Sequence, residues 1–418
     1  MVLAQPAATD VDASTVGGWQ SRLARRTAGN DGFLTGILAL ANADGVINFT
    51  GGFPAPELFP TDTVAGIVSD ILDGDARVAL QYAPSNGIAG TRDAFADYLL
   101  EADGLRPADA ELMVTSGGID AVTLIAKSMI DPGDVVAVEE PTYLGAISGF
   151  AGLDAVLRGL PMDDDGLDVQ ALAELVAGGV IPKLVYTIPD YQNPSGRSMS
   201  QSRRAALIEL CRAHRILIVE DVAYRELGFY GDRSVSLWSQ APDMVVQIGT
   251  FSKTFFPGIR LGWAAGPAEV IAQLVVAKQN SDQCAGAMGQ RMVEAYLRGG
   301  FLPAQIERER ALYRDRGDAM ARALSAHLDP AAQWTVPRGG FFSWLRVPGV
   351  NTAELALAAR AANVAFVPGA PFFAEQVRHD YLRLSFSRAD EAEIDLGIAR
   401  LAQVIDEFPT DPDTGDKL

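Results

Sequence analysis

Residues 244–262 read MVVQIGTFSKTFFPGIRLG. The mostly apolar run 244–248 predicts a strand buried on both faces of a sheet, and a loop rich in aromatic and hydroxyl groups follows it. Lys253 lies in this loop among aromatic residues, where loss of water would lower the pKa of its amine and make it a nucleophile toward an aldehyde. The hydroxyls and the fixed cation that a phosphate group needs are also present, in Thr250, Ser252 and Arg260. On this spacing alone, a surface loop with an extended lysine is an equally good interpretation.

Apolar runs of the same kind recur along the chain, and most end in a polar or glycine-rich turn that leads into a helical pattern. They cover residues 112–115, 135–138, 183–188 and 216–220. Strands of solid Val, Ile and Leu are typical of a parallel sheet covered on both faces, so their alternation with helices predicts an α/β domain. After about residue 300 the pattern changes to a long charged helix and two strands of a smaller α+β lobe, at residues 306–328, 341–345 and 381–386.

The composition narrows the class of protein and the kind of partner. A chain of 418 residues is long enough for two domains, and a net charge of −19 argues against nucleic acid and anionic membranes as partners. Two cysteines and three histidines occur without the spacing of a metal site, so we expect no metal. The first residues lack the basic and apolar regions of a signal peptide, and no run of 18 apolar residues occurs. These features favour a cytoplasmic protein.

A carboxylate stands at the end of one predicted strand, which is where ligands bind in open α/β sheets. Residues 216–224, ILIVEDVAY, place Asp221 at this end and Tyr224 three residues later. A carboxylate in this position can keep a pyridine nitrogen protonated. For this segment alone, a helix N-cap at Asp221 is the simpler interpretation.

Two more strand ends carry turns that could hold a ligand. Residues 186–196, YTIPDYQNPSG, contain Asn193 in a turn-forming Asn-Pro pair. Residues 114–121, VTSGGIDA, predict a strand, a glycine turn and the start of a helix, whose free N–H groups can bind phosphate. Taken alone, each segment is also an ordinary turn.

Taken together, and in the order in which they occur along the chain, the segments resemble those of fold-type I aminotransferases of class I/II, which use pyridoxal 5′-phosphate (PLP). The likeness runs from about residue 49 to residue 387. Two segments look most like the 2-aminoadipate/kynurenine branch of that family: residues 48–60 (NFTGGFPAPELFP) and 80–87 (LQYAPSNG).

The resemblance also implies how the chain is divided. It implies a large PLP-binding domain at residues 51–300, with a mostly parallel seven-stranded sheet between helices, and a small C-terminal α+β domain at residues 301–418. Residues 1–50 would form an N-terminal arm, in which residues 16–43 carry apolar positions close to helical spacing.

The resemblance assigns candidate residues around the cofactor. Lys253 would hold PLP as a Schiff base, Asp221 would bind the ring nitrogen, and Tyr143, in the segment EPTY, would stack on the ring. The phenolic oxygen would contact Tyr224 and Asn193. The phosphate would be bound by Ser116, Gly117, Gly118, Ile119, Thr250, Ser252 and Arg260, and by Tyr82 of the neighbouring subunit in a homodimer.

One of these positions departs from the family pattern. Ile119 stands where the family often has a polar side chain, commonly glutamine. The departure leaves phosphate binding in this segment to Ser116 and to backbone amides.

The resemblance also assigns the substrate site. Arg383, in residues 382–387 (LRLSFS), would grip the α-carboxylate of the amino acid, a planar task that suits a guanidinium. Asn193, Gly51 and Gly52 would complete this site. For the segment alone, an ordinary arginine at a strand edge is an equal alternative.

The implied reaction moves an amino group from an α-amino acid to a 2-oxo acid such as 2-oxoglutarate, with Lys253, Asp221 and Tyr143 as catalytic residues. The branch includes enzymes with aromatic, branched and acidic substrates, so we expect aromatic, aliphatic or 2-aminoadipate-like donors. Elimination, racemisation or cyclisation on the same scaffold remains open, and so does a PLP-binding regulator without enzymatic activity. Three arginines of the arm could bind a side-chain carboxylate, although such residues more often form a solvated helix face: Arg22, Arg25 and Arg26.

Overall fold

The structure is a computed structural model that describes residues 19–22, 24, 45–231 and 234–410. The predicted helical arm at residues 16–43 lies almost wholly outside these ranges, and the short 3-10 helix η1 (Trp19–Arg22) is described within it. Arg22 is exposed, whereas Arg25 and Arg26 lie outside the described residues. Recognition of a substrate by these arginines therefore stays a prediction.

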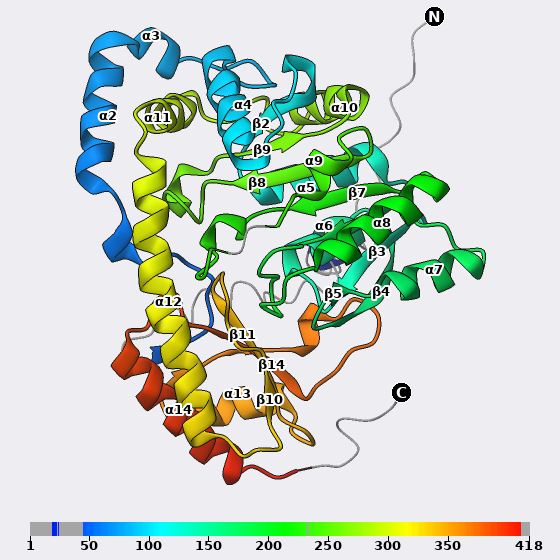
Figure 1. The fold of residues 1–418 in the computed structure, drawn as a ribbon, viewed down its shortest axis with the longest axis vertical. Coiled ribbons are helices and arrows are strands. Elements are labelled where there is room, and N and C mark those ends of the chain that lie inside the picture. The colour runs from blue at the N-terminus through cyan, green and yellow to red at the C-terminus, as the bar shows by residue number, and fades with distance from the viewer. Residues whose placement is uncertain (1–18, 23, 25–44, 232–233, 411–418) are drawn as a thin grey trace, which may run out of the picture.

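A large sheet occupies the upper part of the molecule in Figure 1. Its strands lie in the order β2 (Leu112–Thr115), β9 (Gly262–Ala265), β8 (Val245–Thr250), β7 (Leu217–Asp221), β6 (Leu184–Thr187), β3 (Val135–Glu140), β4 (Val156–Asp163) and β5 (Gly166–Leu167). The strands from β8 to β4 are parallel, and β9 runs antiparallel to both β8 and β2. The mostly parallel sheet of the predicted α/β fold is confirmed.

The predicted number of seven strands omits one short strand at the edge. After β4 the chain turns back at Gly166, whose φ of +91° is a left-handed value that glycine adopts without strain. The two residues of β5 then pair with Met162 and Asp163. The sheet thus has seven longer strands and an eighth that is two residues long.

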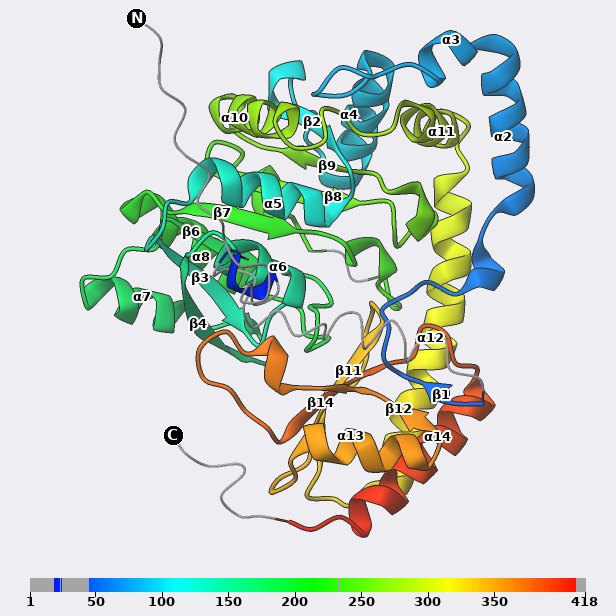
Figure 2. The same ribbon diagram turned by 180° about the vertical axis from the view of Figure 1, so that it is seen from behind.

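Helices cover both faces of the sheet, because successive apolar side chains of a strand point to opposite faces and both faces are therefore apolar. Val219 of β7 belongs to the apolar cluster on the face covered by α5 (Gly118–Met129), α6 (Leu144–Ala151) and α10 (Ala268–Gln279), which Figure 2 shows in front of the strands. Ile218 belongs to the cluster on the opposite face. The helices there are α4 (Ala89–Asp103), α7 (Val169–Ala177), α8 (Gln201–His214), α9 (Leu237–Gln240) and α11 (Ala287–Arg298).

A second, smaller sheet lies in the C-terminal lobe. Its strands lie in the order β10 (Gln333–Trp334), β11 (Phe342–Arg346), β14 (Tyr381–Ser385) and β13 (Val367–Pro368). The long helix α12 (Leu302–His327) connects the two parts of the molecule, and α13 (Thr352–Ala361) and α14 (Glu391–Asp406) complete the lobe (Figure 1). The predicted helix at 306–328 and the predicted strands at 341–345 and 381–386 are therefore found, with ends shifted by a few residues.

The segment before residue 51 also joins this lobe. The short strand β1 (Ile47–Asn48) pairs in parallel with β12 (Val364–Ala365), and Phe49 accepts a backbone hydrogen bond from Ser385. This pairing brings residues 50–52 beside β14, next to the large sheet. The domain boundaries at residues 50 and 300 stay predictions.

Helices α2 (Thr61–Gly74) and α3 (Ala76–Ala79) lie at the outer edge of the molecule, beside α11 (Figure 1). Across the described ranges, no helix is both long and apolar enough to span a membrane. The same ranges contain no cluster of three or more side chains suited to bind a metal ion.

Candidate active site

Lys253 follows β8 and lies where the large sheet meets the C-terminal lobe. Its Nζ donates a 2.9 Å hydrogen bond to the carbonyl oxygen of Gly52 and lies 5.8 Å from the ring centre of Tyr224 and 5.9 Å from that of Phe341. Part of the side chain is exposed, but enclosure of the amine, together with the nearby charges of Arg383 and Arg260, lowers the pKa of Lys253 to about 8. The predicted reactive lysine therefore lies in a setting that favours a neutral amine.

Asp221 ends β7 and is buried beside Lys253. It accepts hydrogen bonds from the hydroxyl of Tyr186 at 2.7 Å and from the backbone N–H of Ala223 at 3.1 Å. Burial raises the pKa of Asp221, and the bond from Tyr186 opposes that rise. Tyr143, just before α6, is half-buried; burial raises its pKa and the charge of Asp221 adds to the rise. The carboxylate and the aromatic ring thus lie near each other.

Glycine, hydroxyl and guanidinium groups converge between β2 and β8. Gly117 caps the N-terminus of α5 with a φ of +94°, and a Cβ built on it would lie 2.9 Å from Nη2 of Arg260. Arg260 donates to the hydroxyl of Ser252 at 3.3 Å, and Thr250 donates to the same oxygen at 2.9 Å. Gly118 faces Thr250, with a built Cβ at 3.8 Å. A helix N-terminus, a guanidinium and two hydroxyls form a cradle suited to a phosphate.

Ser116 and Ile119 lie at the edge of this cradle. The hydroxyl of Ser116 donates to Asp282 at 2.7 Å and accepts from Lys278 at 3.0 Å, and its backbone N–H donates to Asp120 at 2.7 Å. Ile119 is 37% exposed. The serine side chain is therefore already occupied within the chain, so its role in phosphate binding stays a prediction.

Tyr82 lies apart from the other candidate residues. Its side chain is 79% exposed, and its backbone N–H donates to the side chain of Gln81. Within the part of the chain described, no hydrogen bond or ring contact joins the Tyr82 side chain to the cradle. Its predicted contribution requires a second subunit.

Arg383, on β14, is buried, and none of the described residues gives it a charged partner. Its Nη1 donates to Oδ1 of Asn193 at 2.8 Å, and its Nη2 donates to the carbonyl oxygen of Thr50 at 2.6 Å. The guanidinium lies 4.3 Å from the ring centre of Phe342 and 5.0 Å from that of Phe372. No carboxylate among the described residues forms an ion pair with it, and its Nε has no hydrogen-bond partner there. Burial lowers the pKa of Arg383 to about 10.

These contacts suit Arg383 to the binding of an anion. Both of its acceptors among the described residues are neutral oxygens, so nothing in that part of the chain balances the buried positive charge. A carboxylate that approached the guanidinium would balance this positive charge and form charge-assisted hydrogen bonds with it.

Asn193 joins the two halves of the candidate site. Besides accepting from Arg383, it forms a side-chain hydrogen bond with Tyr224, whose pKa is raised by burial. The loop after β6 carries Asn193, while Tyr224 follows β7. The structure therefore brings together Lys253, Asp221, Tyr224, Asn193, Arg383 and the glycine segment at residues 51–52.

The sequence prediction omitted several side chains that shape the site. Tyr186 opens the quoted segment 186–196 and binds Asp221, and Phe342 and Phe372 flank Arg383. Glu139, fully enclosed at the end of β3, accepts from Thr187 at 2.5 Å and from Gln192 at 2.9 Å, and burial raises its pKa to about 7. A glutamate directly after four apolar residues of β3 was the available signal for a buried polar group.

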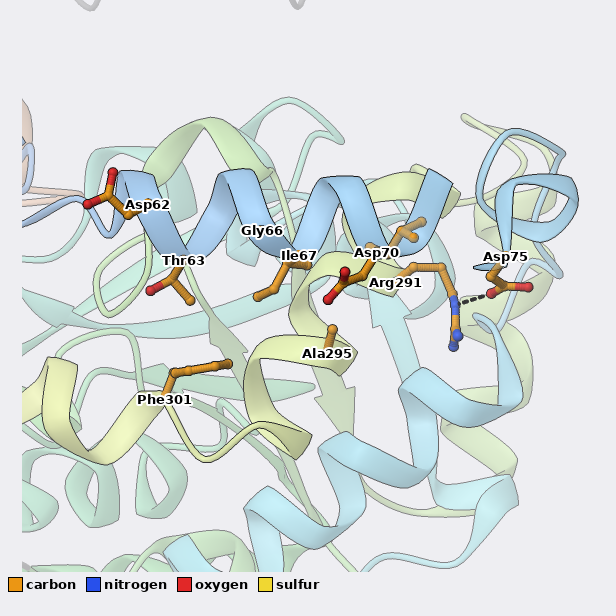
Figure 3. A pocket seen from close by; sticks show the side chains of 10 residues that line it. Asp62, Thr63, Gly66, Ile67, Asp70, Asp75, Arg291, Ala295 and Phe301 are labelled. Atoms are coloured by element: carbon orange, nitrogen blue, oxygen red, sulfur yellow. Dashed lines mark ion pairs between the residues drawn. The ribbon is translucent and has the colours of Figure 1, made fainter. Parts of the chain in front are cut away.

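A separate pocket lies between α2 and α11 and shares no residue with this site. Figure 3 shows Asp62, Thr63 and Asp70 of α2 above it, with Arg291 and Ala295 of α11 and Phe301 on the other side. Arg291 is held by Asp75 at 2.6 Å, the ion pair drawn in Figure 3.

The residues present fit PLP. The cradle around Gly117 suits a phosphate, the lysine of lowered pKa suits an aldehyde, and the buried carboxylate of Asp221 suits a pyridine nitrogen. The buried Nε of Arg383, which has no partner within the described ranges, suits a second, carboxylate-bearing molecule beside it.

Comparison with known proteins agrees with the geometry. The family model described as "Aminotransferase class I and II" matches residues 48–401. The aromatic-amino-acid aminotransferase 1 of Thermococcus litoralis is 37% identical over 378 residues, which cover 89% of this chain and 90% of that protein. The 2-aminoadipate transaminase of Thermus thermophilus is 36% identical over 374 residues, which cover 88% of this chain and 92% of that protein.

A solved structure gives the same result for the fold. The kynurenine aminotransferase of Pyrococcus horikoshii, crystallised in complex with PMP and with kynurenine as substrate, aligns with a TM-score of 0.90 and 34% identity. The alignment covers 94% of this chain and 98% of that one. By its sequence, its fold and the match over residues 48–401, the chain belongs to the class I and II aminotransferases.

Proposed function

We propose that the protein transfers the amino group of an aromatic, aliphatic or 2-aminoadipate-like amino acid to a 2-oxo acid such as 2-oxoglutarate, with PLP as cofactor. One observation carries the proposal: the lysine of lowered pKa shares its site with a buried arginine whose charge no described carboxylate balances. An amino acid offers both groups that such a site requires, an amine and a carboxylate. The relatives named for aromatic amino acids, 2-aminoadipate and kynurenine support this donor class.

The cofactor, when bound, supplies an aldehyde for the amine and a ring that draws electrons away from the substrate Cα. We assign two tasks to Lys253, which are to hold the cofactor and to carry a proton on Nζ away from the substrate Cα and back. The second task requires a neutral amine. With a pKa of about 8, roughly one amine in ten is neutral at pH 7, against fewer than about one in a thousand for an ordinary lysine.

Arg383 would bind the α-carboxylate of the donor and of the acceptor alike. Its planar fork is held between Phe342 and Phe372 and fixed by Asn193, so little side-chain freedom is lost when a carboxylate binds. This orientation sets the substrate Cα near Lys253 and keeps water from the bound carboxylate.

Asp221 and Tyr143 would act on the ring of the cofactor. A carboxylate fixed by Tyr186 and Ala223 can keep a ring nitrogen protonated, which helps the ring to accept electrons. The ring of Tyr143 offers a flat apolar surface against which the cofactor can stack. The cradle of Gly117, Gly118, Thr250, Ser252 and Arg260 would hold the phosphate, and Ile119 would contribute a backbone amide at its edge.

Other reactions on this scaffold are the principal alternative, and one experiment separates them. The PLP-loaded protein is mixed with phenylalanine, leucine or 2-aminoadipate in the absence of any 2-oxo acid. Transamination yields at most one 2-oxo acid and one pyridoxamine phosphate per chain. Serine, which carries a leaving group on Cβ, is added to the panel, and its continued turnover to pyruvate and ammonia would instead favour elimination. No conversion with any amino acid would favour a binding protein.

We also propose a homodimer with shared active sites, in which Tyr82 contacts the phosphate in the neighbouring subunit. The exposed apolar side chains around α3 support an interface there: Leu72, Val78, Leu80 and Tyr82. We also propose a cytoplasmic location. Cys211 and Cys284 are both free thiols, which suits a reducing compartment. Cys211 is buried, and burial raises the pKa of its thiol to about 12.

A further inference from the structure

Arg204 binds both ends of the loop that carries Asn193. This arginine lies in the first turns of α8 and has no exposed surface. Its Nη2 donates to the carbonyl oxygen of Pro189 at 2.9 Å and to the carboxylate of Asp190 at 2.6 Å, and its Nε donates to the carbonyl oxygen of Met199 at 3.1 Å. One guanidinium therefore fixes the segment on either side of Asn193.

The same guanidinium faces the strand that carries Asp221. Its Nη1 lies 3.9 Å from Oε1 of Glu220, the residue before Asp221. The carboxylate of Glu220 also accepts hydrogen bonds from the backbone N–H groups of Leu237 and Trp238, at 2.7 and 2.9 Å. Glu220 points away from the cofactor side, because neighbouring residues of a strand face opposite sides of the sheet.

A second arginine extends this cluster to the third candidate residue. Arg225 follows Tyr224, pairs with Asp103 and lies 3.9 Å from the carboxylate of Asp190. The buried cluster therefore contains a residue close in sequence to each of three cofactor-site residues: Glu220 next to Asp221, Arg225 next to Tyr224, and Asp190 three positions before Asn193.

We infer that Arg204 is a positioning residue of the active site: it sets the place of Asn193 relative to Arg383 and Tyr224 without touching substrate or cofactor. The inference rests on the proposed function. Only a flat fork of five N–H groups reaches two carbonyl oxygens and a carboxylate together, so a lysine would keep the charge beside Asp190 and Glu220 but release an end of the loop. A displaced loop would loosen the bond between Asn193 and Arg383.

The test compares the variant Arg204→Lys with the control Arg203→Lys in the PLP-loaded protein. Arg203 is the adjacent residue on α8 and binds Asp163 at 2.5 Å and the carbonyl oxygen of Leu167 at 2.7 Å, away from the site. Four quantities are measured: KM and kcat with phenylalanine and 2-aminoadipate, the pH midpoint of the visible absorbance of bound PLP, and the melting temperature.

For Arg204→Lys, we expect KM to rise about tenfold with kcat changed less than about threefold, because binding of the carboxylate is weakened in ground and transition states alike. The pH midpoint should rise by about half a unit or more, because Asn193 and Tyr224 would no longer stabilise the phenolate oxygen of the cofactor as well. Arg203→Lys should change neither quantity. In an Asn193→Ala background, Arg204→Lys should add nothing further to either, since both act through one contact.

A merely structural role gives a different result. If Arg204→Lys lowers the melting temperature but leaves KM and the pH midpoint as in the wild type, or if its effects add fully to those of Asn193→Ala, the inference is overturned. Should Arg204→Lys fail to fold, Asp190→Asn weakens the same contact and is judged by the same criteria. If the wild-type protein binds PLP but converts no amino acid, the proposed function fails, and the midpoint data still decide whether Arg204 positions Asn193.

Discussion

Asn193 and Arg383 are joined by a 2.8 Å hydrogen bond between the loop after β6 and strand β14 of the C-terminal lobe. The bond links the part of the site that faces the cofactor to the part that would receive the substrate carboxylate. Arg383 is buried with no charged partner among the described residues. Its hydrogen-bond acceptors there are this amide oxygen and the carbonyl oxygen of Thr50, and both are neutral.

Substitution of Arg383 by lysine should weaken substrate binding. The variant loses the bidentate fork and its contact with Asn193, so we expect KM for amino donors to rise about 30- to 300-fold, which corresponds to about 2–3 kcal/mol of lost charge-assisted hydrogen bonding. Steady-state kinetics with phenylalanine measure the change. The exposed Arg388 provides the control, and an equal effect of Arg388→Lys would argue against a specific role for Arg383.

The cradle around Gly117 predicts a difference between two neighbouring glycines. Gly117→Ala introduces a Cβ 2.9 Å from Arg260 at a φ of +94°, so it should displace the guanidinium and weaken PLP binding by about tenfold or more. Gly118→Ala meets Thr250 at 3.8 Å, an ordinary contact, and should bind PLP nearly as the wild type does. Titration of the apo-protein with PLP measures both constants, and equal affinities for the two variants would contradict this account of the phosphate site.

The lowered pKa of Lys253 predicts a pH-dependent stability of the apo-protein. Its pKa is about 8 in the folded chain and 10.5 ordinarily, so between these values the unfolded chain binds more protons and the free energy of unfolding rises with pH. Lys253→Met removes the buried charge and should raise the free energy of unfolding by up to about 3 kcal/mol at pH 7, and by much less near pH 10. Urea unfolding at the two pH values measures the difference, and a gain independent of pH would show that the amine is not enclosed as described.

A shared active site predicts rescue between two inactive variants. Lys253→Ala and Tyr82→Ala should each be impaired as homodimers. Mixed dimers would contain one complete site, built from Lys253 of one subunit and Tyr82 of the other, so a refolded equimolar mixture should recover up to about a quarter of the wild-type activity. Light scattering confirms the assembly. A mixture no more active than its separate components would show that Tyr82 does not act across an interface.

The predictable part of the fold was the part with strands covered on both faces. In β7 the adjacent residues Ile218 and Val219 pack into different apolar clusters, which is why the sequence shows an unbroken apolar run. The strand β4 escaped prediction because its residues are mostly half-exposed or exposed, and Arg158, Gly159 and Pro161 interrupt its apolar run. The strand β9 escaped because Gly-Trp-Ala-Ala carries no strand pattern.

The site was predictable where a motif follows a strand and unpredictable where distant segments meet. Lys253, Asp221 and Asn193 follow β8, β7 and β6, so their convergence at one edge of the sheet follows from the parallel order. The aromatic faces of Phe342 and Phe372 against Arg383 depend on how the strands of the C-terminal lobe pair, which no local pattern encodes.

The most direct test of the central claim follows the nitrogen atom itself. The PLP-loaded protein is supplied with ¹⁵N-labelled phenylalanine, leucine or 2-aminoadipate together with unlabelled 2-oxoglutarate, and the products are analysed by mass spectrometry. The account predicts ¹⁵N in glutamate and an equal amount of the donor's 2-oxo acid, with both products absent for Lys253→Ala. Label released as ammonia, or label that stays in every donor, would contradict it.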